Sequence, residues 1–187
     1  MRNESALLAP SGEFLTVFGK DHPVLLSGET SITRGMHYAP AETEIGNIGT
    51  VICYDLDFTD TTRKVARAGA DVIAVPSLDW PEVAPVHYTH MVFRAIENRV
   101  SMIKADVGFD SAIVDPYGRL LQRVVTPKAG VFAILTADVP LSPGDTLTMR
   151  WGDWVGWIAL AGLGLFHLSD IGMTLIRQKH RQAAAKE

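Results

Sequence analysis

Short apolar runs alternate with polar turns along residues 1–140, and this alternation predicts an α/β domain. The runs at 6–9 and 14–18 flank the turn sequence Pro-Ser-Gly-Glu and predict a hairpin. Residues 25–44 show no period and contain Pro and Gly, which predicts a long loop, and long loops often carry function.

The pattern from residue 48 to residue 76 predicts a strand, a helix and a strand. The apolar runs at 48–54 and 71–76 are rich in β-branched residues, as strands buried on both faces are. The stretch 59–70 between them predicts a helix capped by Thr59 or Asp60, so the three segments form a βαβ unit. The other predicted elements are a helix at 85–99, a strand at 101–105, a hairpin of 112–115 with 120–125, and a last strand at 131–139.

The C-terminal part has a different pattern. Residues 154–176 form an apolar run about as long as a membrane-spanning helix requires, with tryptophans at its start and basic residues after it. A buried core helix is the alternative, and Asp170 within the run opposes insertion. We therefore expect an α/β domain at 1–140, a linker at 141–153, one transmembrane helix at 154–176 and a basic cytoplasmic tail at 177–187.

Composition narrows the functional classes. The 187 residues carry a net charge of −4, which gives no reason to expect nucleic-acid binding, and nothing in the sequence indicates a metal or a cofactor. The single cysteine, Cys53, cannot form an internal disulfide. It is either a small buried apolar residue or a nucleophile.

The position of Cys53 favours the nucleophile. It ends a predicted buried strand, where ligands bind in open α/β sheets, and the backbone amides of Tyr54 and Asp55 lie near enough to serve an oxyanion. The negative charges of Asp55 and Asp57 disfavour a thiolate, so activation needs a cation or base from elsewhere. Lys20 is the basic candidate upstream, and an ordinary surface lysine is the alternative.

Four segments, in order, resemble motifs of the nitrilase (carbon–nitrogen hydrolase) superfamily. They are Gly19-Lys20-Asp21-His22-Pro23-Val24, Val51-Ile52-Cys53-Tyr54-Asp55, Arg94-Ala95-Ile96-Glu97-Asn98 and Ile113-Val114-Asp115-Pro116-Tyr117-Gly118. The segment Thr148-Met149-Arg150-Trp151-Gly152-Asp153-Trp154, followed by the apolar run, is similar to the end of bacterial apolipoprotein N-acyltransferases. The resemblance implies a nitrilase-type α-β-β-α sandwich lacking its N-terminal part, joined to one C-terminal transmembrane helix.

The resemblance also implies roles for individual residues. Cys53 would form a thioester, Lys20 with the Tyr54 amide would stabilise the oxyanion, and Glu29 would support the site. Asp55 stands where the acyltransferases often have Glu. Trp80 would line the substrate site, although an aromatic plug at a strand end is an equal alternative for it.

One element of the family's Glu-Lys-Cys triad has no match. The family's general-base Glu lies well before the lysine, whereas only Glu4 and Glu13 precede Lys20, and neither matches it. The expectation is therefore that the chain lacks its base, and that a missing N-terminal segment or a second chain supplies it. Asp55 is the one in-chain substitute considered.

The resulting hypothesis is acyl transfer from a phospholipid to a lipoprotein N-terminus through a Cys53 thioester. The expected location is the bacterial inner membrane, with the catalytic part periplasmic and the C-terminus cytoplasmic. One alternative is a membrane-tethered amidase or nitrilase acting on a small amine or amide substrate. Another is a non-catalytic membrane protein that uses the fold for interaction.

Overall fold

The computed structural model describes residues 2–29, 35, 37–128, 130–141 and 144–184, which form two compact units divided between Gly152 and Asp153. The elements in chain order are β1 (Glu4–Leu8), β2 (Phe14–Gly19), the 3₁₀ helix η1 (Leu25–Ser27), β3 (Ala41–Thr43), β4 (Gly46–Thr50), the 3₁₀ helix η2 (Cys53–Asp57), α1 (Thr59–Arg67), β5 (Val72–Ser77), α2 (Ala84–Asn98), β6 (Ser101–Asp106), β7 (Asp110–Val114), β8 (Leu120–Val125), α3 (Leu147–Trp151) and α4 (Trp154–Ala184). Part of the predicted loop 25–44, at residues 30–34 and 36, lies outside the described residues.

A six-stranded mixed sheet organises the first unit, in the order β3-β4-β5-β6-β7-β8. The central pairs β4–β5 and β5–β6 are parallel, and the outer pairs are antiparallel. The hairpin of β1 and β2 forms a separate two-stranded sheet, as the sequence predicted. The predicted βαβ unit is confirmed by β4, α1 and β5, and the predicted nitrilase-type α/β fold agrees with this mixed sheet.

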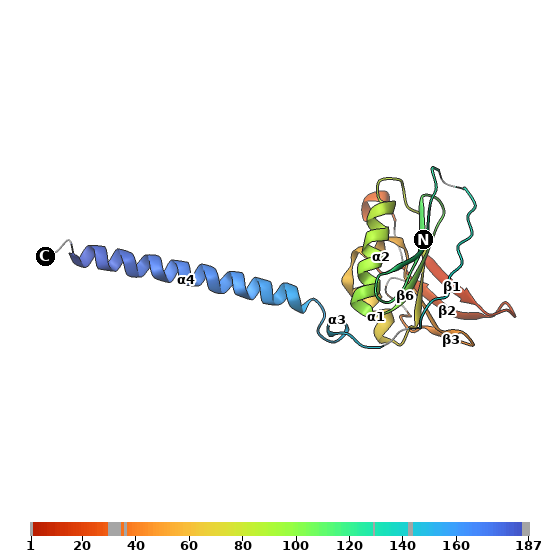
Figure 1. The fold of residues 1–187 in the computed structure, drawn as a ribbon, viewed down its shortest axis with the longest axis horizontal. Helices are drawn as coiled ribbons and strands as arrows, with labels where there is room; N and C mark the ends of the chain where they lie inside the picture. Colours follow the sequence, from red (N-terminus) through yellow and green to blue (C-terminus); the bar gives the residue numbers. More distant parts are fainter. Residues whose placement is uncertain (1, 30–34, 36, 129, 142–143, 185–187) are drawn as a thin grey trace. The chain divides into compact units, whose positions relative to one another are not determined.

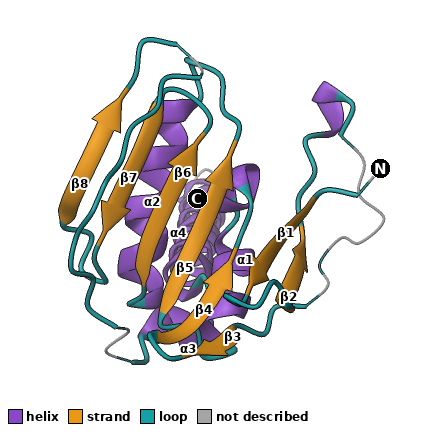
Figure 2. Ribbon diagram, turned by 90° about the vertical axis from the view of Figure 1, so that its right-hand side faces the viewer, coloured by secondary structure: helices purple, strands orange, loops and turns teal. Residues whose placement is uncertain are grey.

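The core lies between the sheet and one layer of helices. Figure 2 shows α1 and α2 on one face of the sheet. From β5, Ile73 and Val75 are fully buried in this layer, and Met91 and Ala95 of α2 pack in the same apolar cluster. Burial of these side chains fixes both helices against the strands that carry the site.

The strand predicted at 48–54 ends earlier than expected. β4 ends at Thr50, and Val51 continues the pairing only through one bond from its amide to the Ala74 carbonyl, 3.1 Å long. The chain then turns into η2. The sequence does not indicate this end of the strand, because the apolar run continues through Val51 and Ile52. These two residues are buried although they lie outside the strand.

The predicted cap of the first helix is wrong. Phe58 is the N-cap of α1, and it makes no side-chain capping bond. Its ring stacks on the His22 ring at 3.7 Å between centroids and meets Tyr54 edge-on. Tertiary packing of an aromatic ring therefore sets the start of this helix instead of a polar cap.

The strand predicted at 131–139 is also wrong, since the structure gives these residues no regular secondary structure. The segment runs across the sheet face opposite α1 and α2 (Figures 1 and 2), so its amides cannot join the ladder in the plane of the sheet. Phe132 and Ile134 are almost fully exposed there. Apolar composition predicted a strand, but no neighbouring strand lies beside it within the described chain.

The stretch expected to be a linker contains the short helix α3. Its N-cap Thr146 accepts a hydrogen bond from Met149 and donates one to the Glu97 carbonyl at the end of α2. Met149 packs against the apolar core. Residues 147–151 therefore belong to the first compact unit.

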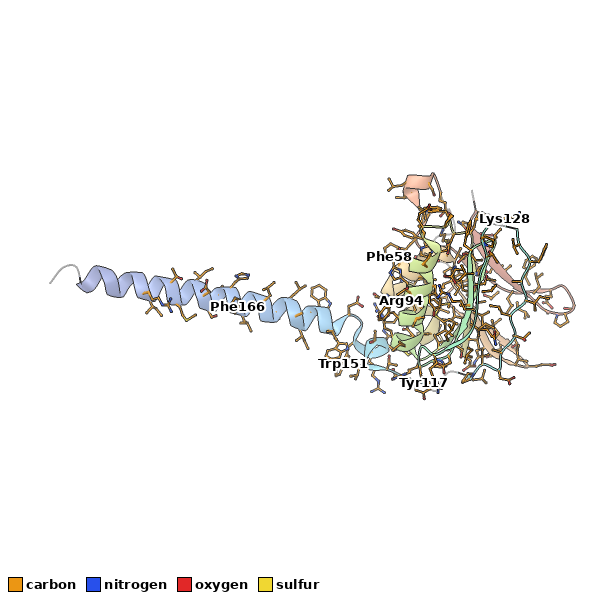
Figure 3. All side chains as sticks on the ribbon, turned by 45° about the horizontal axis from the view of Figure 1, so that its top comes forward. Phe58, Arg94, Tyr117, Lys128, Trp151 and Phe166 are labelled. Atoms are coloured by element: carbon orange, nitrogen blue, oxygen red, sulfur yellow. The ribbon has the colours of Figure 1, made fainter. Side chains whose placement is uncertain are left out.

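The second unit is the single helix α4, which extends from Trp154 to Ala184 and so includes most of the predicted tail. Its segment Trp154–Thr174 is long and apolar enough to cross a membrane. None of that segment is buried by protein, which is unlike a core helix. Figure 3 shows its described side chains, Phe166 among them, projecting from several sides of the helix.

Candidate active site

Cys53 is the first residue of η2 and lies at a sharp backbone turn that follows β4. Its φ of 46° lies in the left-handed region, which costs a non-glycine residue roughly 1 kcal/mol or more. The side chain is half-buried and lines a cavity. A strained turn that presents a thiol to a cavity is an arrangement typical of a nucleophile.

Asp55 ties this turn to the segment that follows Lys20. Its Oδ1 accepts from the His22 amide at 2.8 Å, and its Oδ2 accepts from the Ile52 amide at 3.0 Å. Burial raises the pKa of the Asp55 carboxyl to about 7, although both amides and the Lys20 charge act in the opposite direction. His22 Nδ1 also lies 3.5 Å from Oδ1, so the Asp55 carboxylate holds the turn at Cys53 and the segment after Lys20 together.

The oxyanion expectation needs one correction. The Asp55 amide donates to the Ile52 carbonyl at 2.9 Å within the turn, so it is already used. Of the two amides predicted for the oxyanion, that of Tyr54 therefore stays the candidate.

Lys20 is a buried lysine with only 1% of its surface exposed, unlike an ordinary surface lysine. Its Nζ donates to Glu29 Oε2 at 2.7 Å, and the Val24 amide donates to the same oxygen at 2.9 Å. Burial acts to raise the pKa of Glu29, but these two donors outweigh it and hold the pKa below its usual value. The pair therefore carries a fixed cation next to an ionised carboxylate.

One cavity brings most of the predicted site residues together. Cys53, Tyr54, Glu29 and Trp80 all line it, whereas Lys20 reaches it through Glu29 and Asp55 does not line it. Trp80 is about half exposed, which fits contact with a substrate better than a plug in the core. The other lining residues are Val24, Asp57, Leu78, Asp79, Val83, Val86 and His87.

Sequence reasoning missed two residues of the cavity that contact each other and the thiol. Cys53 Sγ donates to Asp79 Oδ1 at 3.1 Å, and His87 Nδ1 bonds the same oxygen at 2.8 Å. His87 Nε2 lies 3.2 Å from Asp57 Oδ1, an ion-pair contact that is not aligned as a hydrogen bond. Asp79 follows β5 and His87 begins α2, so only the parallel sheet brings them to Cys53.

A buried lysine completes this network. Lys104 Nζ lies 2.7 Å from Asp79 Oδ2 and 2.7 Å from Asp106 Oδ2, and it donates to the Asp110 carbonyl. Burial acts to raise the pKa of Asp79, but the hydrogen bond to His87 and the charge of Lys104 hold the pKa well below its usual range. The sequence held a weak signal, the lysine inside the predicted strand 101–105, because a lysine that is buried in a sheet needs a charged partner.

The same network bears on metal binding. Ligand atoms of Cys53, Asp79 and His87 lie within 4.8 Å of one another, a set that could hold a metal ion. Lys104 already places a positive charge on the shared carboxylate, which opposes a second cation there. At the other candidate cluster, of Asp21, His22 and Asp60, Lys64 pairs with both carboxylates in the same way.

The mixed sheet, the turn at Cys53 and the contact of buried Lys20 with Glu29 together define an α/β fold with a cysteine at the mouth of a cavity. Residues 1–145 match the carbon-nitrogen hydrolase family, and the chain belongs to that family.

The relatives include both acyltransferases and amidases. The chain is 30% identical to an apolipoprotein N-acyltransferase of Geobacter metallireducens over 86% of its own length and 32% of the relative's. It is 35% identical to one of Gloeobacter violaceus over 66% of its own length and 24% of the relative's. A deaminated glutathione amidase of Mus musculus is 32% identical over 65% of this chain and 44% of that protein. The chain thus spans about a third or less of the acyltransferase relatives.

Solved structures support the fold. Nit3 of Saccharomyces cerevisiae, a nitrilase-superfamily protein, superposes with a TM-score of 0.59 at 24% identity, over 66% of this chain and 49% of that one. An amidase variant from Nesterenkonia, which carries an acetamide adduct at its active-site cysteine, gives a TM-score of 0.58 at 22% identity, over 66% of this chain and 51% of that one.

Proposed function

We propose that the chain transfers an acyl group through a thioester on Cys53, from a phospholipid donor to an amine acceptor such as a lipoprotein N-terminus. The observation that carries the proposal is the Cys53 turn, which opens into a cavity that also holds the carboxylate of Glu29, the partner of the buried Lys20. In this mechanism the cation of Lys20 and the Tyr54 amide stabilise the negative oxygen that forms when sulfur attacks an acyl carbon.

The extent of the resemblance favours an acyltransferase over an amidase. The match to the Geobacter acyltransferase covers 86% of the chain, so it must continue past residue 145 toward the apolar helix. The matches to amidases cover about two thirds of the chain. A lipid donor also fits a catalytic unit that is joined to a long apolar helix.

For the membrane, we infer that α4 spans a bacterial inner membrane with its C-terminus in the cytoplasm. Arg177, Lys179 and Arg181 follow the apolar run, as the positive-inside rule requires for a cytoplasmic end. Asp170 within the run costs roughly 3 kcal/mol at a membrane centre, and less here because it lies toward the basic end. The catalytic unit would then face the periplasm.

The test is to map acyl adducts by mass spectrometry. The purified chain in detergent is incubated with a phosphatidylethanolamine carrying a labelled acyl chain, next to Cys53→Ala. We expect a labelled thioester on Cys53 and none in the variant, with amine acceptors releasing it as an amide. Label that persists in Cys53→Ala contradicts the proposal, and release only to water supports hydrolysis of a small C–N bond instead.

A further inference from the structure

The outer face of α2 carries no charge. The exposed residues of this helix are Pro85, Val86, Thr89, Phe93 and Ile96. Val86 is 45% exposed and Phe93 is 53% exposed, so both side chains present apolar surface away from the core. At about 100° per residue, Val86, Phe93 and Ile96 fall within about 80° of one another around the helix. A surface helix usually has charged and polar residues on its outer face, so this face indicates contact with something less polar than water.

The short helix α3 extends this apolar surface from the end of α2. Its N-cap Thr146 donates a hydrogen bond to the Glu97 carbonyl, one residue after Ile96. Leu147 and Trp151 lie four positions apart, on one side of α3, and are 52% and 65% exposed. The residues that we call the α2–α3 surface are Val86, Phe93, Ile96, Leu147 and Trp151.

The chain limits how far this surface can lie from a membrane. Trp151 is three positions before Trp154, where the apolar segment Trp154–Thr174 begins. Three residues of extended chain reach at most about 10 Å. Tryptophan is also enriched where a membrane meets water. If α4 spans a bilayer, α3 therefore lies at or near the bilayer surface.

We propose that the α2–α3 surface lies on the lipid bilayer that α4 spans, with its apolar side chains at the boundary between headgroups and acyl chains. The proposal rests on the membrane insertion of α4 proposed above. An apolar helix face at this boundary is typically buried about 5–10 Å deep. Lipid is the occupant that the chain itself supplies, because the short connection to α4 keeps α3 beside the bilayer. A second copy of the chain would have to associate in addition.

The α2–α3 surface extends to the candidate active site. Val86 belongs to this surface and also lines the cavity of Cys53. Leu78 and Trp80 line the same cavity and are exposed as well. The proposed contact therefore brings one edge of the cavity to the lipid. A phospholipid donor would then reach Cys53 from the bilayer without crossing bulk water.

The test measures which face of the catalytic unit touches lipid. Phe93→Cys and Phe132→Cys are made in the full chain with Cys53→Ala, so each variant has one thiol for a fluorescent NBD label. The chains are inserted into vesicles of phosphatidylethanolamine and phosphatidylglycerol, with or without phospholipid that carries a nitroxide at the top of an acyl chain. Phe132 is the matched control, an exposed phenylalanine in the segment that crosses the sheet face opposite α2.

We expect the label at Phe93 to lose most of its emission to the nitroxide, and the label at Phe132 to keep nearly all of it. Phe93 lies far from α4 in the sequence, so its quenching reports the orientation of the catalytic unit and not merely the tether. If Phe93→Cys does not fold, Ile96→Cys on the same face replaces it.

An unquenched label on α2, or equal quenching at Phe93 and Phe132, would overturn the proposal. A label at Phe93 that is shielded from water yet unquenched means that a second copy covers this face, and it overturns the proposal as well. The outcome is separable from the proposed function. A wild type that takes an acyl chain from phospholipid while Phe93 stays unquenched keeps the function and loses this surface. Quenching at Phe93 in a chain that never takes such an acyl chain keeps the surface and loses the function.

Discussion

Replacement of Lys104 by methionine tests whether the buried charge network supports the fold. Lys104 has no exposed side-chain surface and lies 2.7 Å from carboxylate oxygens of both Asp79 and Asp106. Its removal leaves the buried carboxylate of Asp106 without this cation and that of Asp79 with His87 alone, and the loss of one partner of a buried ion pair typically costs about 3–5 kcal/mol. The matched control is Lys64→Met, because Lys64 also contacts two carboxylates but is 43% exposed, where such pairs contribute about 0–1 kcal/mol.

The destabilisation caused by Lys104→Met should also depend on pH. The pKa of Asp79 is lowered in the folded protein, so its ion pairing stabilises the fold above the unfolded pKa of about 3.9. That stabilisation is lost as pH falls through the lower folded value. In Lys104→Met the carboxylates can take up protons instead. The loss of unfolding free energy that the substitution causes should therefore become smaller toward about pH 4.

The assay is hydrogen exchange of peptides from β5 and β6, which reports the opening free energy of the catalytic unit separately from α4. We expect a large loss of protection at neutral pH in Lys104→Met and a small one in Lys64→Met. Equal losses in the two variants, or a Lys104→Met cost that does not change with pH, would refute the argument.

Three further predictions concern the core, the site and the membrane. Gly49→Ala should destabilise the fold by about 1–3 kcal/mol, since a Cβ there would lie 2.4 Å from Val65 Cγ1, and adding Val65→Ala should restore part of the loss in urea unfolding. The pKa of Asp55 is raised to about 7, so its contribution to stability is present below the unfolded pKa and is lost as pH rises through about 7. Melting temperatures should show this decline in the wild type but not in Asp55→Asn, and a parallel decline would contradict the assignment. Alkaline carbonate should leave the chain in the membrane pellet, whereas full release would mean that α4 does not insert.

The local pattern of apolar and polar residues predicted most of the helices and strands. It does so because a helix or strand that packs on another layer needs apolar residues at its own period. It failed at 131–139, where an apolar segment crosses the sheet without joining it, and at Phe58, where ring stacking replaces a polar cap. Both failures depend on contacts between segments distant in the chain, which a local pattern does not contain.

The sequence motifs identified part of the residues that line the candidate cavity. Cys53, Tyr54, Glu29 and Trp80 were all named from the sequence and line one cavity. Asp79 was passed over, although it directly precedes Trp80, because its partners come from another helix and another strand. The charge environment of a carboxylate depends on the groups that surround it in the folded protein, and a local sequence motif does not contain these groups.

The left-handed backbone at Cys53 makes cysteine less favourable for stability than glycine would be at the same position. Glycine adopts this conformation without penalty, so a change from Cys53 to Gly would relieve roughly 1 kcal/mol of strain while it removes the only thiol of the chain. Selection for stability alone would therefore favour glycine at this position. A cysteine that occupies it in spite of the strain fits the proposed role of Cys53 as the nucleophile.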